Sequence, residues 1–154
     1  MASQSPYYNY PLKAYRFKVS AAGGADGTLN GDILCSEVSG LDASFEEVEY
    51  RNGADTGIVK HKQHGLITYS NITLKRGSTD SIDWFNFIYN QIAGETKRVT
   101  LTIELLDDTQ ATKAKWEVKE AWPVKWTGPD LNSTSSEVAF ESIEICNEGI
   151  QRIS

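Results

Sequence analysis

Alternation of apolar and polar residues predicts β-strands along most of the chain. The stretch "AYRFKVS" at residues 14–20 has an apolar residue at every second position, and "VTLTIELL" at 99–106 repeats the pattern. A period of two is typical of a strand with one face on a core and the other in water. Strand character also runs from Ile33 to Tyr50, with a break at "SGL", and resumes after the turn-rich "RNGADTG".

Two changes of parity predict irregularities in these strands. Ile67 and Tyr69 are odd-numbered, whereas the following apolar residues, at 72 and 74, are even. Because neighbouring side chains point to opposite faces, we expect a bulge or bend near Ser70 and Asn71. The same reasoning predicts a bulge near residues 141–142, between the even pair at 138 and 140 and the odd pair at 143 and 145.

One segment has helical spacing instead. In "STDSIDWFNFIYNQIAGE", apolar residues recur at Ile82, Phe85, residue 88 or 89, and Ile92. Thr79 or Asp80 is the expected N-cap, and Gly94 the expected stop. The spacing predicts one helix whose aromatic side chains contact the core.

The segment "AWPVKWTGPDLN" at residues 121–132 interrupts a strand with a proline. Strand alternation places Trp122 and Trp126 on one face, with Pro123 between them. Proline has no N–H to donate, so in a sheet it occupies an edge, a first residue or a bulge. An edge strand at this point needs a partner.

These elements predict a mainly β protein. About six or seven strands, joined mostly by short turns, indicate a single small antiparallel β-barrel or sandwich with one flanking α-helix. Residues 1–13, rich in Ser, Tyr, Asn and Pro, are expected to form a flexible N-terminal arm, and residues 14–154 a single domain.

Composition narrows the classes of function. The formal net charge of -6 argues against nonspecific binding to nucleic acid or to anionic lipid. No apolar run approaches the roughly 20 residues of a membrane span, and the first residues lack the pattern of a signal peptide, so we expect synthesis in the cytoplasm without membrane insertion. Cys35 and Cys146, far apart in sequence, are expected to be unpaired.

Candidate chemistry is sparse. His61 and His64 lie in a predicted strand, where an odd spacing puts the two rings on opposite faces and disfavours a shared metal. No serine elbow or phosphate-binding glycine pattern is present. The carboxylates alternate along strands, as solvated faces do. We therefore expect no catalytic, cofactor or metal site, and no enzyme activity.

Several longer stretches resemble a known family. They are "CSEVSGLDASFEEVEYRNG", "LITYSNITLKRGSTDS", "WFNFI" and "AWPVKWTGPDLNSTSSEVAFESIEICNEG". In the same order, and from about Tyr15 to Gly149, they are similar to the inner tube proteins of contractile phage tails and of extracellular contractile injection systems. The resemblance implies a fold related to the ring protein of type VI secretion.

The resemblance also implies partners. Six copies would close into a ring, and rings would stack into a hollow tube inside a contractile sheath. Baseplate, spike and terminator proteins would bind the tube ends, and an effector protein would be carried in the lumen. Such particles assemble in the bacterial cytoplasm and are then released or anchored at a membrane. "RGSTDSIDWFNFI" and the "AWPVKWTGPDLN" block favour the injection systems.

Two sets of residues follow from this expectation. A contact with a neighbouring subunit is predicted for the polar loop 51–57, with its strand ends, and for the proline edge: Arg51, Asn52, Gly53, Asp55, Gly57, Trp122, Pro123 and Trp126. The resemblance implies four lining strands, near residues 44–50, 58–69, 113–119 and 138–145. Their lumen-facing candidates are Glu47, Glu49, Lys60, Lys62, Lys115, Glu117, Lys119, Glu141 and Glu144, a set expected to leave the bore negative on balance.

Two alternatives remain open. The tube of a contractile-tailed phage, which conducts DNA, shares the same motifs. A protein of a different class, a monomeric β-barrel module, would use the "RNGADTG" loop to recognise a small ligand. A monomer in solution whose melting temperature shifts with ligand would favour the second alternative.

Overall fold

A computed structural model describes residues 11–23, 31–54, 56–92 and 97–154. Within them, every pair of neighbouring strands is antiparallel. The elements are β1 (Phe17–Ala22), β2 (Gly31–Ile33), β3 (Glu37–Ser39), β4 (Ala43–Tyr50), β5 (His61–Tyr69), β6 (Ile72–Gly77), α1 (Asp83–Ile92), β7 (Val99–Leu106), β8 (Thr112–Thr127), β9 (Phe140–Cys146) and β10 (Gly149–Arg152).

Eight strands form one curled sheet, in the order β2-β1-β7-β8-β9-β6-β3, with β10 also paired to β8. The long strand β8 pairs with β7 in its first part and with β9 in its second. It bends at a bulge where Glu120 takes a positive φ of 52°. The terminal strands β2 and β3 are joined by residues 34–36 but do not pair, so the sheet curls over its core without closing. The mainly β antiparallel fold with one helix was therefore predicted correctly.

The core is made by the inner faces of the strands. In β7 the alternation is complete, with Val99, Leu101 and Ile103 buried and the threonines between them half-buried. Ile72 and Leu74 of β6 meet the inner face of β9 in the same way. The largest fully buried side chains are Trp84, Phe87, Ile72, Leu74, Leu101, Ile143, Ile145, Val19 and Val118.

The predicted helix is present, but a different face is buried. Trp84 and Phe87 are 1% and 0% exposed, whereas Phe85 is 46% exposed. The rings of Trp84 and Phe87 face the core. The side chains of Ile82, Phe85 and Tyr89 therefore lie on the exposed side. The hydroxyl of Ser81 accepts the hydrogen bond from the backbone N–H of Asp83, the first residue of the helix. The two residues expected to do this, Thr79 and Asp80, do not. The predicted stop at Gly94 lies outside the described residues.

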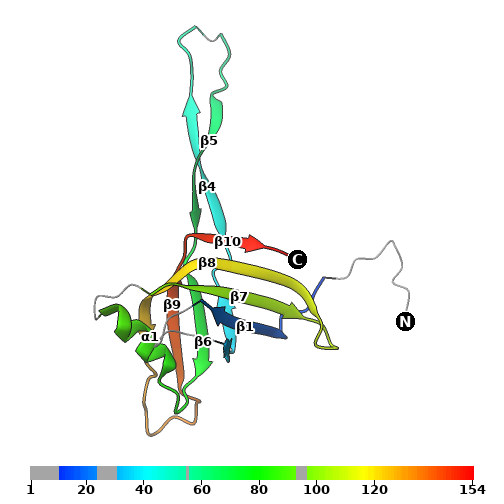
Figure 1. The fold of residues 1–154 in the computed structure, drawn as a ribbon. Coiled ribbons are helices and arrows are strands. Elements are labelled where there is room, and N and C mark those ends of the chain that lie inside the picture. Colours follow the sequence, from blue (N-terminus) through cyan, green and yellow to red (C-terminus); the bar gives the residue numbers. More distant parts are fainter. Residues whose placement is uncertain (1–10, 24–30, 55, 93–96) are drawn as a thin grey trace.

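Strands β4 and β5 pair only with each other and project from the sheet as a long hairpin (Figure 1). We call residues 43–69 the arm. All eight residues of β4 are exposed, so the chain itself buries neither face of this strand. A two-stranded hairpin in water is marginally stable at best. The arm therefore lacks the packing that stabilises the rest of the sheet.

One of the two predicted irregularities is correct. The chain breaks between β5 and β6 at Ser70 and Asn71, as the parity change indicated. The predicted bulge at residues 141–142 is wrong, because β6 and β9 pair without a register shift from residue 140 to 145. The even apolar residues Val138 and Phe140 are exposed, and Glu141 lies on the inner face of β9 with Ile143 and Ile145.

Candidate assembly surfaces

The predicted contact loop lies at the end of the arm. Residues 51–60 join β4 to β5, so Arg51, Asn52, Gly53 and Gly57 lie at the tip, away from the curled sheet (Figure 1). Asp55 lies outside the described residues. The position of the loop makes it accessible to another molecule, and its contact with a neighbouring subunit stays a prediction.

The arm carries apolar side chains that the rest of the chain does not cover. Phe45 is 58% exposed and Leu66 is 76% exposed. The ring of Phe45 lies 5.3 Å from that of His64, tilted by 58°, and the ring of Tyr50 lies 5.3 Å from that of His61, tilted by 31°. Since residues 45 and 50 lie on opposite faces of β4, the two histidines also lie on opposite faces, as predicted. Exposed apolar side chains gathered on both faces of one element are typical of an interaction site.

Acidic and basic side chains of the arm pair with one another. Lys60 lies 3.5 Å from Glu49, and Lys62 lies 3.8 Å from Glu47 and 4.0 Å from Glu49. These exposed pairs add little stability. However, two carboxylates face two ammonium groups, so these four lumen-facing candidates contribute no net charge. A negative bore would therefore depend on residues elsewhere in the chain.

The β8 candidates lie along one strand of the curled sheet. Lys115 is 3.9 Å from Glu104 on β7, and Glu117 lies opposite Thr102 in the same ladder. Both are half-buried, whereas Lys119, just before the bulge, is exposed. Lys115 and Glu117 share the outer face of the sheet, because Ala114, Trp116 and Val118 alternate with them toward the core.

Glu141 does not fit the predicted lumen position. It is 7% exposed, and its carboxylate accepts a hydrogen bond from Nε of Arg76 at 2.5 Å. The Arg76 guanidinium lies 4.2 Å above the Trp84 ring and donates to the carbonyl oxygen of Ser81 at 3.3 Å. The carboxylate thus joins β9 to β6, and the Arg76 guanidinium joins β6 to the start of α1. Glu144, in contrast, lies on the outer face and accepts from Asn71 at 2.8 Å.

The tryptophans of the proline segment lie on opposite faces, contrary to the prediction. Trp122 is opposite Cys146 and Trp126 is opposite Ile143, two positions of β9 that differ in parity. A register shift between Pro123 and Lys125 causes this exchange of faces. Trp126 packs on the core and meets Phe85 edge-on at 5.4 Å.

Pro123 itself lies where the ladder allows it. The pairing of β7 with β8 ends at Ala121, and from Trp122 onward the described pairing of β8 is with β9 alone. Pro123 therefore combines a one-sided stretch of strand with a bulge, two positions that need no proline N–H. Its role in assembly stays a prediction.

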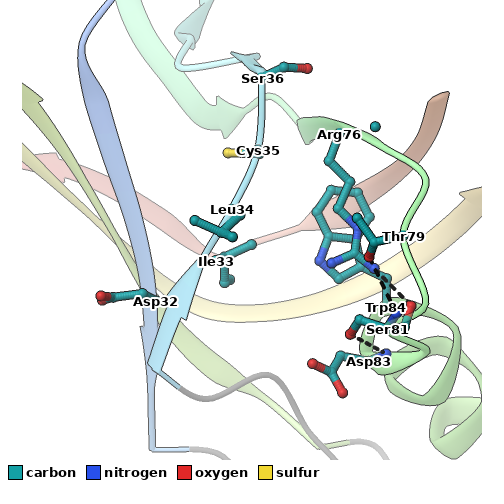
Figure 2. Close-up of a pocket in the computed structure, with 11 residues that line it drawn as sticks. Asp32, Ile33, Leu34, Cys35, Ser36, Arg76, Thr79, Ser81, Asp83 and Trp84 are labelled. Carbon is teal, nitrogen blue, oxygen red and sulfur yellow. Dashed lines mark hydrogen bonds between the residues drawn. The ribbon is translucent and has the colours of Figure 1, made fainter. Parts of the chain in front are cut away.

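A pocket of about 670 Å³ lies between residues 32–36 and the start of α1 (Figure 2). Its walls include the Arg76 and Trp84 side chains. Cys35 also lines it, and burial raises the pKa of this thiol to about 11. The thiol is therefore protonated at neutral pH and is a weak nucleophile. Cys35 and Cys146 are both free.

The residues that the structure describes contain no group of three His, Cys, Asp or Glu that could hold a metal ion. In the same part of the chain, no helix is long and apolar enough to cross a membrane.

Comparison with models of known protein families gives one family. The model of the family "T4-like virus tail tube protein gp19" matches residues 13–151. The chain belongs to this tail tube family. No curated protein sequence matches it.

Several solved structures are similar to this chain in fold. A chain of the sheath–tube complex of the extracellular contractile injection system PVC, in the extended state, is 28% identical, with a TM-score of 0.81 over 94% of this chain and 93% of that chain. A chain of the anti-feeding prophage baseplate is 21% identical, with a TM-score of 0.84 over 95% and 97%. Hcp1 from Flavobacterium johnsoniae is 17% identical, with a TM-score of 0.53 over 88% and 93%.

Sequence reasoning missed the arm as a separate element. A signal was present, because Phe45 is odd-numbered whereas Val48 and Tyr50 are even. A strand with one face in water carries apolar residues on the other face alone. Apolar residues on both faces therefore indicate that this strand does not pack as an ordinary half-buried strand. Arg76 was also missed as the partner of Glu141, since 65 residues separate the two in sequence.

Proposed function

We propose that this tail tube protein is the inner-tube subunit of a contractile injection system. Six copies close a ring, rings stack into a hollow tube, and a contractile sheath surrounds the tube. The arm carries this proposal, because its apolar side chains have no cover in their own subunit. The likeness to a chain of the PVC sheath–tube complex supports a sheath as partner.

In this proposal the arm of one subunit docks on a part of its neighbour other than the neighbour's arm. A contact between unlike surfaces is heterologous, and repeated contacts of this kind generate closed rings or open helical filaments. Each subunit gives its arm to one neighbour and receives the arm of another. The free outer edges of β4 and β5 offer main-chain hydrogen bonds, and Phe45 and Leu66 offer apolar surface.

The remaining lumen-facing candidates line the bore in this proposal. The arm contributes balanced charges through Glu47, Glu49, Lys60 and Lys62. With Glu144 and the β8 candidates, the wall is polar and close to neutral, so a protein cargo passes without strong attachment. Baseplate, spike and terminator proteins close the two ends. Assembly takes place in the bacterial cytoplasm, with the particle then released or anchored at a membrane.

Negative-stain electron microscopy of the purified chain tests this proposal. The native chain is expected to form rings or tubes as its concentration rises. Replacing residues 51–57 by a two-residue turn should leave a folded monomer that forms neither. A monomer at all concentrations for the native chain, with a melting temperature that rises with a small ligand, would instead support the binding-module alternative.

A matched pair of variants separates the arm from exposed apolar surface in general. Leu66 on the arm is 76% exposed, and Leu131, in the loop 128–139 that joins β8 to β9, is 85% exposed. Leu66→Ser is expected to prevent ring formation and to keep the melting temperature of the monomer. Leu131→Ser should assemble like the native chain. Normal rings from Leu66→Ser would contradict a role for the arm.

A further inference from the structure

The arm is the continuation of a hairpin that begins inside the curled sheet. Ser39 pairs with Thr73 in the sheet, and Ala43 pairs with Tyr69 in the arm. Equal numbers of residues separate the two pairs on both strands, so the register is kept across the break. The ladder is nevertheless interrupted at Gly40–Asp42 and Ser70–Asn71, which we call the junction.

The backbone at the junction is held closely. Gly40 has a φ of +95°, and a Cβ at this position would lie 2.1 Å from the carbonyl oxygen of Asn71. Only glycine combines this conformation with so close an approach. The N–H of Ser70 donates to the carbonyl oxygen of Asp42 at 3.1 Å, which bridges the two strands at the break.

Two asparagines fasten the junction to β9 and its end. Asn147 is 8% exposed, and its Nδ2 donates to the carbonyl oxygen of Ser70 at 2.9 Å. Asn71 Nδ2 donates to the Glu144 carboxylate at 2.8 Å. The two contacts therefore join the residues between β5 and β6 to β9, the neighbour of β6 in the curled sheet, and to the residue that follows β9. They hold the two residues through which β5 of the arm continues into β6 of the sheet.

Asn147 is an unexpected choice for stability alone. Its Oδ1 is buried and has no hydrogen-bond partner among the described residues. A buried acceptor left unpaired is unfavourable, whereas an apolar side chain of similar size would leave no unpaired group in its own side chain. The amide therefore points to a requirement for its donor, which holds Ser70.

We propose that Asn147, Asn71 and Gly40 are positioning residues that fix the direction in which the arm leaves the body. This rests on the proposed function, in which the arm reaches a neighbouring copy. Six heterologous contacts close a ring only if each turns the next subunit by the same angle. An arm held in one direction also loses less freedom on binding, so assembly needs a lower concentration.

The test compares Asn147→Leu and Asn71→Ala with the native chain and with Asn132→Ala. Asn132 is a matched control, because its Oδ1 accepts from the N–H of Thr134 within the same loop. Spin labels on unnatural side chains at Gln63, in the arm, and Lys113, in the body, report the direction of the arm as a distance distribution. Sedimentation velocity gives the concentration at which rings form, and electron microscopy gives their diameter.

We expect a narrow distance distribution for the native chain and for Asn132→Ala. The two junction variants should broaden or shift it, keep the melting temperature within a few degrees and raise the ring-forming concentration by about tenfold. Unchanged distances and unchanged assembly in both variants would overturn the inference. A native chain that forms no rings, with distances that still broaden in the variants, would support the positioning role and contradict the proposed function.

Discussion

Replacing Glu141 by leucine should destabilise the subunit strongly. The Arg76 and Glu141 side chains are 11% and 8% exposed, so each charge depends on the other for compensation. Removing one partner of a buried ion pair costs about 3–5 kcal/mol, because the remaining charge stays buried without its counterion. For a chain of this length each kcal/mol lowers the melting temperature by about 2–4 °C. Glu141→Leu should therefore lower it by about 6–20 °C.

The double variant Arg76→Leu with Glu141→Leu decides the cause. Replacement of both charges by apolar side chains removes the uncompensated charge, so much of the lost stability should return. Some loss should remain, because Arg76 also lies on Trp84 and donates to Ser81. Thermal unfolding at a concentration where the chain is monomeric measures both variants. If the loss of stability in the double variant equals the sum of the losses in Glu141→Leu and Arg76→Leu, the two residues are not coupled and this account is refuted.

Two further outcomes follow from the same structure. Trp126→Ala should lower the free energy of unfolding by about 2–3 kcal/mol, as measured by chemical unfolding. The loss is smaller than for a fully buried tryptophan, because the ring is only half-buried against the core and Phe85. An unchanged unfolding midpoint would contradict its place in the core. Hydrogen bonds from Thr109 and Ala111 lower the pKa of Asp107 to about 2. The ionised carboxylate therefore stabilises the fold at pH values above its unfolded pKa of about 4. This contribution is lost as the pH falls from about 4 to about 2. Asp107→Asn should flatten the acid side of the stability profile in that range, and an identical profile would refute the assignment.

The strands and the core were largely predictable from alternation. In β7 from Val99 to Ile103, and in β8 from Ala114 to Val118, apolar residues alternate with polar ones, so the period of two gives the buried face directly. The helix was predictable as an element, but its buried face was not. Ile82 and Phe85 have the same spacing as Trp84 and Phe87, and only the packing against the sheet distinguishes the two rows.

Long-range pairing explains the other errors. Glu141 occupies a core position because Arg76 compensates it, and sequence periodicity treats a glutamate as a surface residue. The faces of Trp122 and Trp126 depend on a bulge after Pro123, whose position is set by the pairing with β9. The arm was missed for a similar reason, since β4 and β5 pair only with each other and β4 is exposed along its whole length, so no packing partner in the chain marks them.

Cryo-electron microscopy of tubes assembled from the native chain tests the central claim most directly. The claim predicts rings of six copies in which the arm of each subunit packs against the next, with Phe45 and Leu66 buried at that contact. Rings in which the arms lie in solvent, or a preparation that contains only monomers, would contradict it.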